Sequence, residues 1–526
     1  MLRSCPRIFT ALGALLSALL ALAQQNDIPL NRDIYYDLDR NGAEKSSTMH
    51  TGMRPIIQSR ADLHNVMGFR PDSSHQYYWI TQKLIKEHLI NVKDGGFKMT
   101  IDPVLQFELG QEFQENDLFT NELFLSHNGR GFQLAVDLGP TVSFQSSFYE
   151  NQAVLPAYLY RYAQIQGVVP GQGRIKTFNS RGLDFAWATG NVSWSPRPWF
   201  NAQLGQGRHF VGNGYRSVLL SDNASPYPYV KFSALTTNKR FQYTTIFAKL
   251  QLVGEANRLP TGEASESLFY WKRASFQYLS VNLGPVQLGL FEGTLWKTID
   301  TSGVRPFNAM QMNPVIGVNT IVNGFDGPNT QVLGVDAKYK VTDKMFAYGQ
   351  FALTDPGRSR YAWQVGMQWF DLFRKDLHLL AEFNQATPYA YVRNEARMSW
   401  THNNQPLASP LGTSYAEAVL RVDYGIRQKI WFQGELSMEQ HPFASGIEDV
   451  PGSTIFGPDM PIGTTGKQQQ RLYAGLNVSW RMNQMTNMQL TLGYSMRDLQ
   501  PARTDRNSGV LYIAWHTGLF NRYYDI

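Results

Sequence analysis

The chain has 526 residues, with 48 Lys and Arg against 42 Asp and Glu, and its formal net charge is +6. This excess is small for the length, so it predicts no nucleic-acid partner and argues only weakly for an acidic one. The single cysteine, Cys5, excludes a disulfide framework, and beyond residue 23 there is no apolar run of about 18 residues, the length that a spanning helix requires.

The first 23 residues are predicted to be a secretory signal peptide. They contain two early arginines, an apolar run over residues 8–22, and small residues at Ala21 and Ala23. A basic start, a hydrophobic stretch and a small-residue cleavage site are typical of such peptides. Cleavage near Ala23 would remove Cys5, and the mature chain would then hold no thiol.

Residues 24–95 are predicted to form a periplasmic or plug segment with one helix. The segment is mostly polar and irregular until SSHQYYWITQKLIKEHLI, where a serine can cap a helix over residues 75–90. Gly95 and Gly96 end this pattern. The helix has an apolar flank, and we expect it to lie at or within the periplasmic opening of the domain that follows.

Residues 96–526 are predicted to form a transmembrane antiparallel β-barrel, an all-β fold. In QRLYAGLNVSWRM (470–482) one face holds only apolar side chains, whereas Arg471 and Arg481 lie on the other. The same alternation recurs in MQLTLGYSMR, QVLGVDAKYKV and EAVLRVDYGIR. A soluble sandwich can show it too. Export, the lack of a membrane helix and the number of strands favour an outer-membrane barrel with lipid outside and a polar lumen.

The number of strands follows from the connections, which alternate between short and long. The short ones are at residues 138–140, 195–198, 236–240, 283–285, 341–344, 373–376, 427–429 and 481–487. The long or irregular ones lie near residues 110–128, 150–180, 211–227, 254–266, 298–329, 355–360, 386–413, 441–469 and 499–508. Eight short and nine long connections predict eighteen strands, with the short turns in the periplasm, provided that 118–128 is loop or strand extension.

The third long connection, GRHFVGNGYRSVLLSDNASPYPYV (207–230), is the candidate ligand site. Sugar recognition uses aromatic faces for CH surfaces, planar polar groups for hydroxyls, and arginine for carboxylates. On the outside of the cell this segment would offer all three to an acidic or hydroxyl-rich polysaccharide. The predicted ligand-binding residues are Arg208, His209, Tyr215, Arg216, Asp222, Asn223, Tyr227 and Tyr229, with 155–164, Arg174 and Lys176 as a neighbouring wall.

A structural role for the same residues stays open. Tyr227 and Tyr229 can belong to the outer aromatic girdle of a barrel. Asp222 with Asn223 can make an Asx turn. In that case the segment would brace two strands and bind nothing.

No catalytic residue, cofactor or metal site is predicted. No GxSxG or HExxH motif occurs, and the ten histidines are scattered. DLDRNG (37–42) imitates the start of a calcium loop, but Thr48 stands where a bidentate glutamate is needed.

Five blocks carry a family resemblance. They are EHLINVKDGGFKMTIDPVLQFELG, SSFYENQA, VVPGQGRIK, GNGYRSVLLSDNASPYPYVK and NQPLASPLGTSY. In this order they resemble the gliding motility protein RemB group within the capsule-assembly (Wzi-like) outer-membrane family. The resemblance implies an eighteen-stranded barrel, periplasmic helices that occlude the pore, and surface polysaccharide handling or a part in gliding. Two features depart from it: the stretch 111–128 is long, and the chain ends in YYDI instead of the usual aromatic residue.

Three functions follow from these observations. The first is a non-enzymatic barrel in the outer membrane of a Gram-negative bacterium that acts in surface polysaccharide (capsule) binding or assembly, adhesion or gliding motility. The second is a diffusion channel, and the third is an outer-membrane hydrolase. The expected partners are outer-membrane lipid, surface polysaccharide and other envelope proteins.

Overall fold

The computed structural model describes residues 24–63, 66–69, 78–113, 124–179, 181–253, 269–300, 303–443, 455, 467–500 and 507–526. The predicted signal peptide, residues 1–23, lies outside these residues. Among the helices that are described, none is long and apolar enough to cross a membrane.

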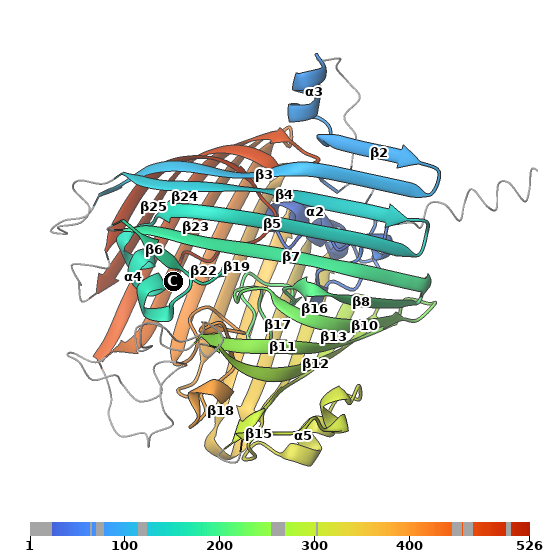
Figure 1. Ribbon diagram of the computed structural model, residues 1–526, viewed down its shortest axis with the longest axis vertical. Helices are drawn as coiled ribbons and strands as arrows, with labels where there is room; N and C mark the ends of the chain where they lie inside the picture. The colour runs from blue at the N-terminus through green and yellow to red at the C-terminus, as the bar shows by residue number, and fades with distance from the viewer. Residues whose placement is uncertain are drawn as a thin grey trace, which may run out of the picture.

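Eighteen antiparallel strands close into a barrel, as predicted (Figure 1). Each strand pairs with the next along the chain, and the last pairs with the first, with Ile513 opposite Leu109. The barrel strands are β3 (Phe97–Phe113), β4 (Leu125–Leu138), β5 (Val142–Val154), β7 (Gly182–Arg197), β8 (Phe200–Gly207), β10 (Tyr227–Leu235), β11 (Phe241–Val253), β12 (Phe269–Leu283), β13 (Val286–Trp296), β16 (Thr330–Thr342), β17 (Met345–Asp355), β18 (Arg360–Phe370), β19 (Leu377–Ala386), β22 (Tyr415–Ile426), β23 (Ile430–Phe443), β24 (Lys467–Asn483), β25 (Met488–Gln500) and β26 (Ser508–Thr517).

The connections between these strands have two distinct ends. All eight predicted tight turns join consecutive strands at one end of the barrel, here called the turn end, and the long connections lie at the opposite loop end. The smaller elements are β1 (Met53–Arg54), η2 (Gln58–Arg60), α4 (Ala157–Gln166), β6 (Lys176–Phe178), β9 (Phe210–Val211), β14 (Ile299–Asp300), β15 (Gly303–Val304), η5 (Ala309–Met312), α5 (Val318–Asn323), η6 (Pro356–Arg358), η7 (Ala396–Met398), β20 (Thr401–His402) and β21 (Gln405–Pro406).

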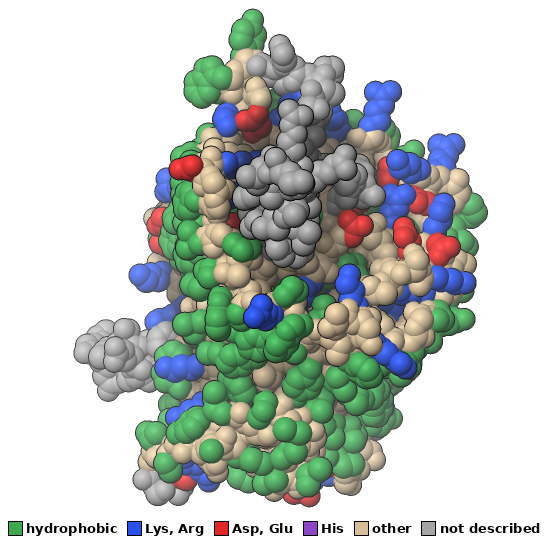
Figure 2. All heavy atoms as spheres, turned by 90° about the vertical axis from the view of Figure 1, so that its right-hand side faces the viewer, with side chains coloured by type: hydrophobic (Ala, Val, Ile, Leu, Met, Phe, Trp, Pro, Cys, Tyr) green, Lys and Arg blue, Asp and Glu red, His purple; other side chains and the backbone are tan. Residues whose placement is uncertain are grey.

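Side chains alternate between the two faces of the barrel wall, as the period-two pattern requires. On β24, Leu476 and Trp480 are exposed on the outer face, whereas Arg471 and Arg481 are buried in the lumen. Figure 2 presents the right-hand side of Figure 1, where the turns after β4 and β7 lie, and hydrophobic side chains cover much of its lower half. The barrel therefore has an apolar outer surface and a polar interior.

The predicted helix over 75–90 is present in a shorter form. It is α3 (Trp79–Ile85), followed by β2 (Ile90–Asp94), which pairs with the turn end of β3. The Asn483 amide, beside the turn after β24, donates to the carbonyls of Lys83 and Glu87 at 3.3 and 2.9 Å. None of the α3 side chains is buried, and the helix projects from the barrel (Figure 1). It thus lies at the rim of the turn end and does not enter the lumen, so of the two expected positions, at or within the opening, the structure excludes the second.

A helix that the sequence pattern did not predict occupies the lumen instead. This is α2 (Arg32–Ala43), whose Asp33 amide donates to the side chain of the capping residue Asn31. Its Tyr36 packs edge-on against Phe370 and Trp431 of the wall, with ring centroids 5.6 and 5.2 Å apart. The helix is polar on average, yet most of it is buried, because a barrel lumen offers charged and hydrogen-bonding partners that a hydrophobic core lacks.

The connection between β13 and β16 packs on the outer wall. Glu292 has the same alternation phase as the exposed Leu288 and Leu290, but it is fully buried. Its carboxylate accepts hydrogen bonds from the Gly317 amide, the Thr320 amide and the Thr320 hydroxyl, each at 2.7 Å. The excursion that carries α5 therefore seals an acidic side chain on the otherwise apolar outer face.

Candidate functional site: the filled lumen and the loop end

The structure places all eight predicted ligand-binding residues inside the barrel. Each retains only 0–5% of its possible exposure. The segment between β8 and β10 turns into the lumen, where Val211 of β9 pairs with Met53 of the N-terminal segment. The expectation of an exposed external surface is therefore wrong. Direct contact of these residues with a ligand stays a prediction, and it would require the segment to leave the lumen.

Arg216 is at the centre of a buried ion cluster. Its guanidinium donates to both Glu417 oxygens, at 2.7 and 3.1 Å, and to both Asp525 oxygens, at 2.7 and 3.2 Å. Burial by itself would lower the pKa of Arg216, but the carboxylates of Asp525 and Glu417 outweigh it and hold the pKa well above its usual range. The cluster therefore connects the segment between β8 and β10 with the wall strand β22 and with the C-terminal tail (residues 518–526).

Tyr215 and Arg216 share a second wall carboxylate. Their backbone amides donate to Glu382 at 2.7 and 2.9 Å. A Cβ atom at Gly214 would overlap the same carboxylate, so only glycine fits there. The Tyr215 hydroxyl lies 2.7 Å from Glu435 and 3.0 Å from Asp525. A phenol has only one proton to donate. Either the Tyr215 hydroxyl shares this proton between the two carboxylates, or one of the carboxyl groups is protonated and donates to the Tyr215 oxygen.

Asp222 and Asn223, in the later part of the segment, also have partners inside the barrel. Asp222 accepts hydrogen bonds from Tyr523 at 2.5 Å and Asn521 at 2.8 Å, both in the C-terminal tail. The Asn223 amide donates to the Pro406 carbonyl at 3.3 Å. Asp222 thus binds the tail, and the Asx turn that we considered is not what orders it.

Arg208 packs between aromatic side chains inside the barrel. The guanidinium carbon of Arg208 lies 5.3 Å from the ring centroid of Trp187 and 5.2 Å from that of Phe520, a cation–π arrangement. Burial lowers the pKa of Arg208 to about 10, with Asp222 opposing this effect, so it is charged at neutral pH. Its guanidinium also donates to the carbonyls of Asp222 and Gly171.

His209 lies between Tyr227 and Tyr229. Its Nδ1 is 3.2 Å from the Tyr227 hydroxyl, and its ring meets that of Tyr229 edge-on at 4.5 Å. Burial holds the pKa of His209 well below its usual range, and Lys231 adds to this effect, so the imidazole is neutral. Both tyrosines face the lumen, so neither belongs to an outer aromatic girdle.

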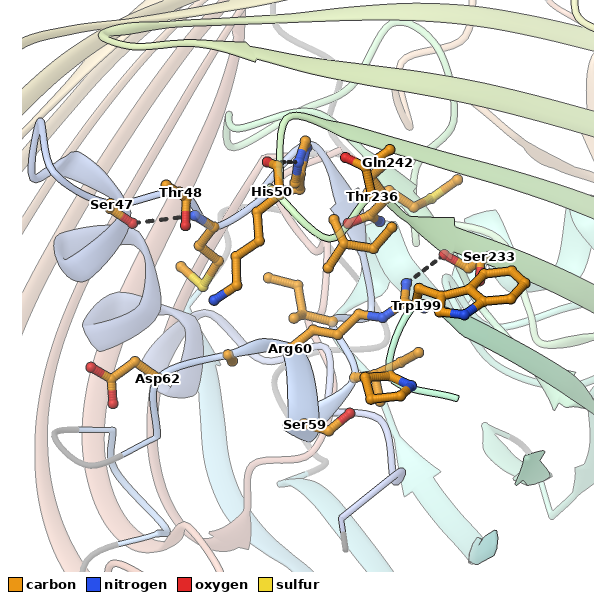
Figure 3. A pocket seen from close by; sticks show the side chains of 18 of the residues that line it. Ser47, Thr48, His50, Ser59, Arg60, Asp62, Trp199, Ser233, Thr236 and Gln242 are labelled. Carbon is orange, nitrogen blue, oxygen red and sulfur yellow. Dashed lines mark hydrogen bonds between the residues drawn. The ribbon is translucent and has the colours of Figure 1, made fainter. Parts of the chain in front are cut away.

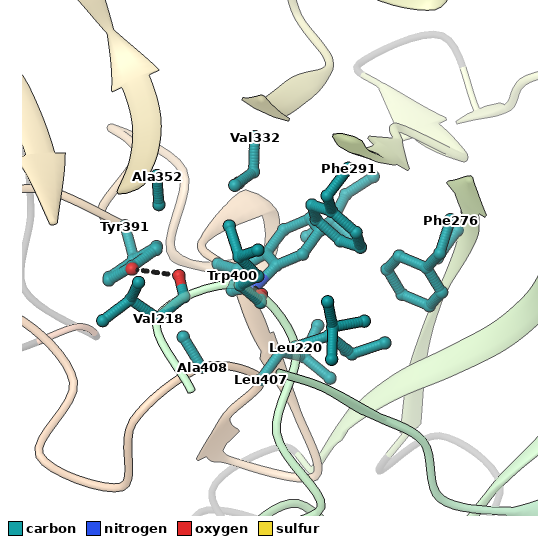
Figure 4. Close-up of a cluster of buried hydrophobic side chains, with 14 of the residues drawn as sticks. Val218, Leu220, Phe276, Phe291, Val332, Ala352, Tyr391, Trp400, Leu407 and Ala408 are labelled. Atoms are coloured by element: carbon teal, nitrogen blue, oxygen red, sulfur yellow. Dashed lines mark hydrogen bonds between the residues drawn. The ribbon is translucent and has the colours of Figure 1, made fainter. Parts of the chain in front are cut away.

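The middle of the segment is apolar and forms a core within the barrel (Figure 4). Val218, Leu219 and Leu220 are fully buried against Tyr391 and Trp400 of the connection between β19 and β22. The Tyr391 hydroxyl donates to the Val218 carbonyl at 2.5 Å, and the Trp400 indole donates to the Leu219 carbonyl at 3.1 Å. Two long connections therefore fold inward together and fill the loop-end half of the lumen.

Sequence reasoning missed the C-terminal tail as a structural element. After β26 the chain returns into the lumen, where the Phe520 ring stacks on Trp187 at 4.8 Å. Asn31 and Arg32 contact the tail through Phe520 and Asn521. The unusual YYDI ending was the available signal, since Tyr523 and Asp525 supply two of the contacts described above.

The loop end carries an exposed surface of mixed aromatic and basic character. It is built by the connection between β5 and β7, which contains α4 and β6 and which we expected to supply a neighbouring wall. Arg161, Arg174 and Lys176 are exposed, and Tyr160 and Tyr162 are half-buried beside them in the sequence. The Tyr158 hydroxyl donates to the Tyr524 carbonyl at 2.7 Å. The loop-end surface, defined by Arg161, Arg174, Lys176, Tyr160 and Tyr162, thus rests on the C-terminal tail.

The calcium-like motif belongs to α2. The Asp37 carboxylate accepts from the Met67 amide at 3.0 Å, and Asp39 forms an ion pair with Arg54 at 2.6 Å. A helical backbone cannot supply the turn that a calcium loop needs. Within the described ranges, no group of three or more His, Cys, Asp and Glu side chains could hold a metal ion.

Comparison with known proteins finds similarity among solved structures. The chain is similar to Wzi, an outer-membrane protein involved in group 1 capsule assembly in Escherichia coli and a carbohydrate-binding β-barrel, with a TM-score of 0.55 and 13% identity over 93% of this chain and 99% of that one. It also matches OccAB4 of Acinetobacter baumannii, with a TM-score of 0.43 and 8% identity over 81% and 98%. OprD of Pseudomonas aeruginosa matches with a TM-score of 0.43 and 9% identity, over 79% of this chain and 94% of that one.

At 13% identity, the likeness to Wzi shows a shared fold alone. The match to Wzi spans nearly the whole of both chains, so it covers the barrel wall and most of the segments that fill the lumen. No protein-family model and no curated protein sequence matches the chain. The resemblance to the gliding motility group stays a prediction.

Proposed function

We propose that this chain is a non-enzymatic barrel of a Gram-negative outer membrane that binds or organises a surface polysaccharide. The observation that carries the proposal is the lumen, which is filled by α2, the segment between β8 and β10, the connection between β19 and β22, and the C-terminal tail. A barrel filled by its own buried ion pairs is poorly suited to bulk diffusion. The likeness to Wzi supports the same class of role.

The ligand surface that we favour is the loop-end surface. Arginine and lysine side chains there can meet carboxylates of an acidic glycan, and tyrosine rings can pack on sugar CH faces. The buried residues Arg208 to Tyr229 would act indirectly, by holding the loops that frame this surface. Capsule assembly, adhesion and gliding are the cellular roles that such binding would serve.

The test is glycan binding by the purified barrel and retention of surface polysaccharide on cells. Replacing Arg161, Arg174 and Lys176 together with alanine should weaken both, and more at low salt than at high salt, because exposed charge contacts are screened. A matched control replaces Arg240 and Lys344, which are exposed at the turn end. Equal binding by the loop-end variant and the parent would exclude this surface.

A diffusion channel is the second candidate, favoured by one cavity. A space of about 260 Å³ lies between the C-terminal tail and the wall, lined by Tyr473, Asn477, Tyr512 and Arg522. If solutes pass there, the parent should conduct in planar bilayers and support liposome swelling. Absence of conductance in the parent, with conductance in a variant lacking residues 518–526, would identify the tail as a plug.

A further inference from the structure

A cavity of about 930 Å³ opens at the turn end, the end opposite to the loop-end surface (Figure 3). One side is formed by the N-terminal segment between residues 41 and 62, and the other by β10, β11, the turn between them and the turn between β7 and β8. Thr48, Thr236 and Lys239 at the rim are exposed, whereas His50 and Ser233 on the floor are buried. The cavity therefore has an accessible mouth and a shielded interior.

The lining is rich in groups that bind hydroxyls. Ser47, Thr48, Ser59, Ser233, Thr236 and Gln242 contribute hydroxyl and amide groups (Figure 3). Trp199 lies in the turn between β7 and β8, lines the cavity and remains 53% exposed. An indole ring beside several hydroxyls can pack on the CH face of a sugar ring.

Arg60 supplies a positive charge that the protein leaves without a carboxylate. Its guanidinium reaches across the cavity to the Ser233 hydroxyl at 2.7 Å and the Ser233 carbonyl at 3.1 Å (Figure 3). Within the part of the chain that is described, no Asp or Glu oxygen lies within 4.0 Å of it. Burial lowers the pKa of Arg60 to about 10, and only Asp27 opposes this effect.

The other charged groups of the cavity do not neutralise Arg60. The Lys231 ammonium lies 3.8 Å from an Asp27 oxygen, so the Asp27 carboxylate is paired with Lys231 and not with Arg60. His50 is neutral, because burial lowers its pKa to about 4. Glu44 and Asp62, the two carboxylates that line the cavity, are exposed, and neither lies within 4.0 Å of the Arg60 guanidinium. By contrast, the buried Arg54 and Arg216 each hold a carboxylate at 2.6 or 2.7 Å, and a guanidinium is a strong bidentate partner for such a group.

We propose that this turn-end cavity binds a carboxylate-bearing saccharide, such as a uronate unit. The Arg60 guanidinium receives the carboxylate, the hydroxyl and amide groups receive the sugar hydroxyls, and Trp199 packs on the ring. The proposal rests on the polysaccharide role for its ligand class, but the site is separate from the loop-end surface. A barrel with a saccharide-binding site at each end can bind an acidic glycan on both sides of the membrane.

The test uses the purified full chain in detergent and titration calorimetry with D-glucuronate, D-glucose, acetate and inorganic phosphate. We expect glucuronate to bind best, since glucose lacks the carboxylate and acetate lacks the ring. Arg60→Gln should weaken glucuronate binding by about tenfold or more while changing glucose binding little. Arg60→Lys should recover part of the loss. The matched control is Arg240→Gln, an exposed arginine of the same end that does not line the cavity.

The outcomes separate this site from the proposed function. If Arg60→Gln binds glucuronate as the parent does, or if phosphate competes more strongly than glucuronate, the saccharide site is refuted. If Arg60→Gln fails to fold, Trp199→Ala provides the second variant, and it should weaken glucuronate and glucose alike. Equal binding of both sugars by a folded Trp199→Ala variant and the parent would also refute it. Retention of surface polysaccharide on cells should be unchanged in Arg60→Gln.

Discussion

Replacing Arg216 with methionine should release the C-terminal tail from the lumen. The guanidinium makes four hydrogen bonds to Glu417 and Asp525 between 2.7 and 3.2 Å, and both carboxylates are buried. Removing one side of such a pair leaves uncompensated buried charge and costs about 3–5 kcal/mol. Glu417 keeps Ser437 at 2.9 Å and stays in the strand ladder, so the tail is the part that moves.

Cysteine labelling measures that movement. The chain has one cysteine, Cys5, so Ile526→Cys in a chain without Cys5 gives a single reporter on the tail. Labelling by an impermeant maleimide should be slow in the Arg216 parent. It should rise in Arg216→Met by about two to three and a half orders of magnitude, up to the rate of a free thiol, because 1.4 kcal/mol corresponds to about tenfold.

A cluster replacement provides the matched control for this prediction. Arg216→Met combined with Glu417→Leu and Asp525→Leu removes the charges together, and exchange of a whole buried ion cluster for apolar groups is often neutral. This variant should therefore label slowly. Rapid labelling of the parent, or no increase in Arg216→Met, would show that the ion cluster does not hold the tail.

Three further predictions concern other parts of the molecule. His50 has a pKa lowered to about 4 by burial, against about 6.5 when unfolded, so the docked N-terminal segment should lose stability as pH falls from about 6.5 toward 4. Proteolysis of this segment across that range should show the loss in the parent, and His50→Gln should abolish it. Trp400→Ala should destabilise the lumen core by about 3–5 kcal/mol, seen as a lower unfolding midpoint, whereas an unchanged midpoint would contradict the core role. Glu292→Leu should leave the two amides and the hydroxyl of its partners unsatisfied and expose the β13–β16 connection to protease while the barrel stays folded; equal protease resistance would refute the sealing role.

The sequence by itself determined the barrel. Strict alternation over β22, β24 and β25 requires one apolar and one polar face, and the eight tight turns divide the chain into eighteen strands that close into a ring. These are local properties, because a strand has a period of two and a tight turn needs only a few suitable residues. The outer face of the wall could therefore be read from residues such as Leu476 and Trp480.

Only the tertiary structure decided what lies inside the barrel. Arg216, Glu417 and Asp525 are far apart in the chain, and no local pattern indicates that they meet. Polar side chains in a long loop are predicted to be exposed, because most loops lie at a protein surface in contact with water. A barrel lumen reverses that expectation, because its wall carries inward-facing charges that can pair with those of α2, the tail and residues 207–229. The same polar composition therefore fills the interior here and leaves the loop-end surface to the connection that carries α4.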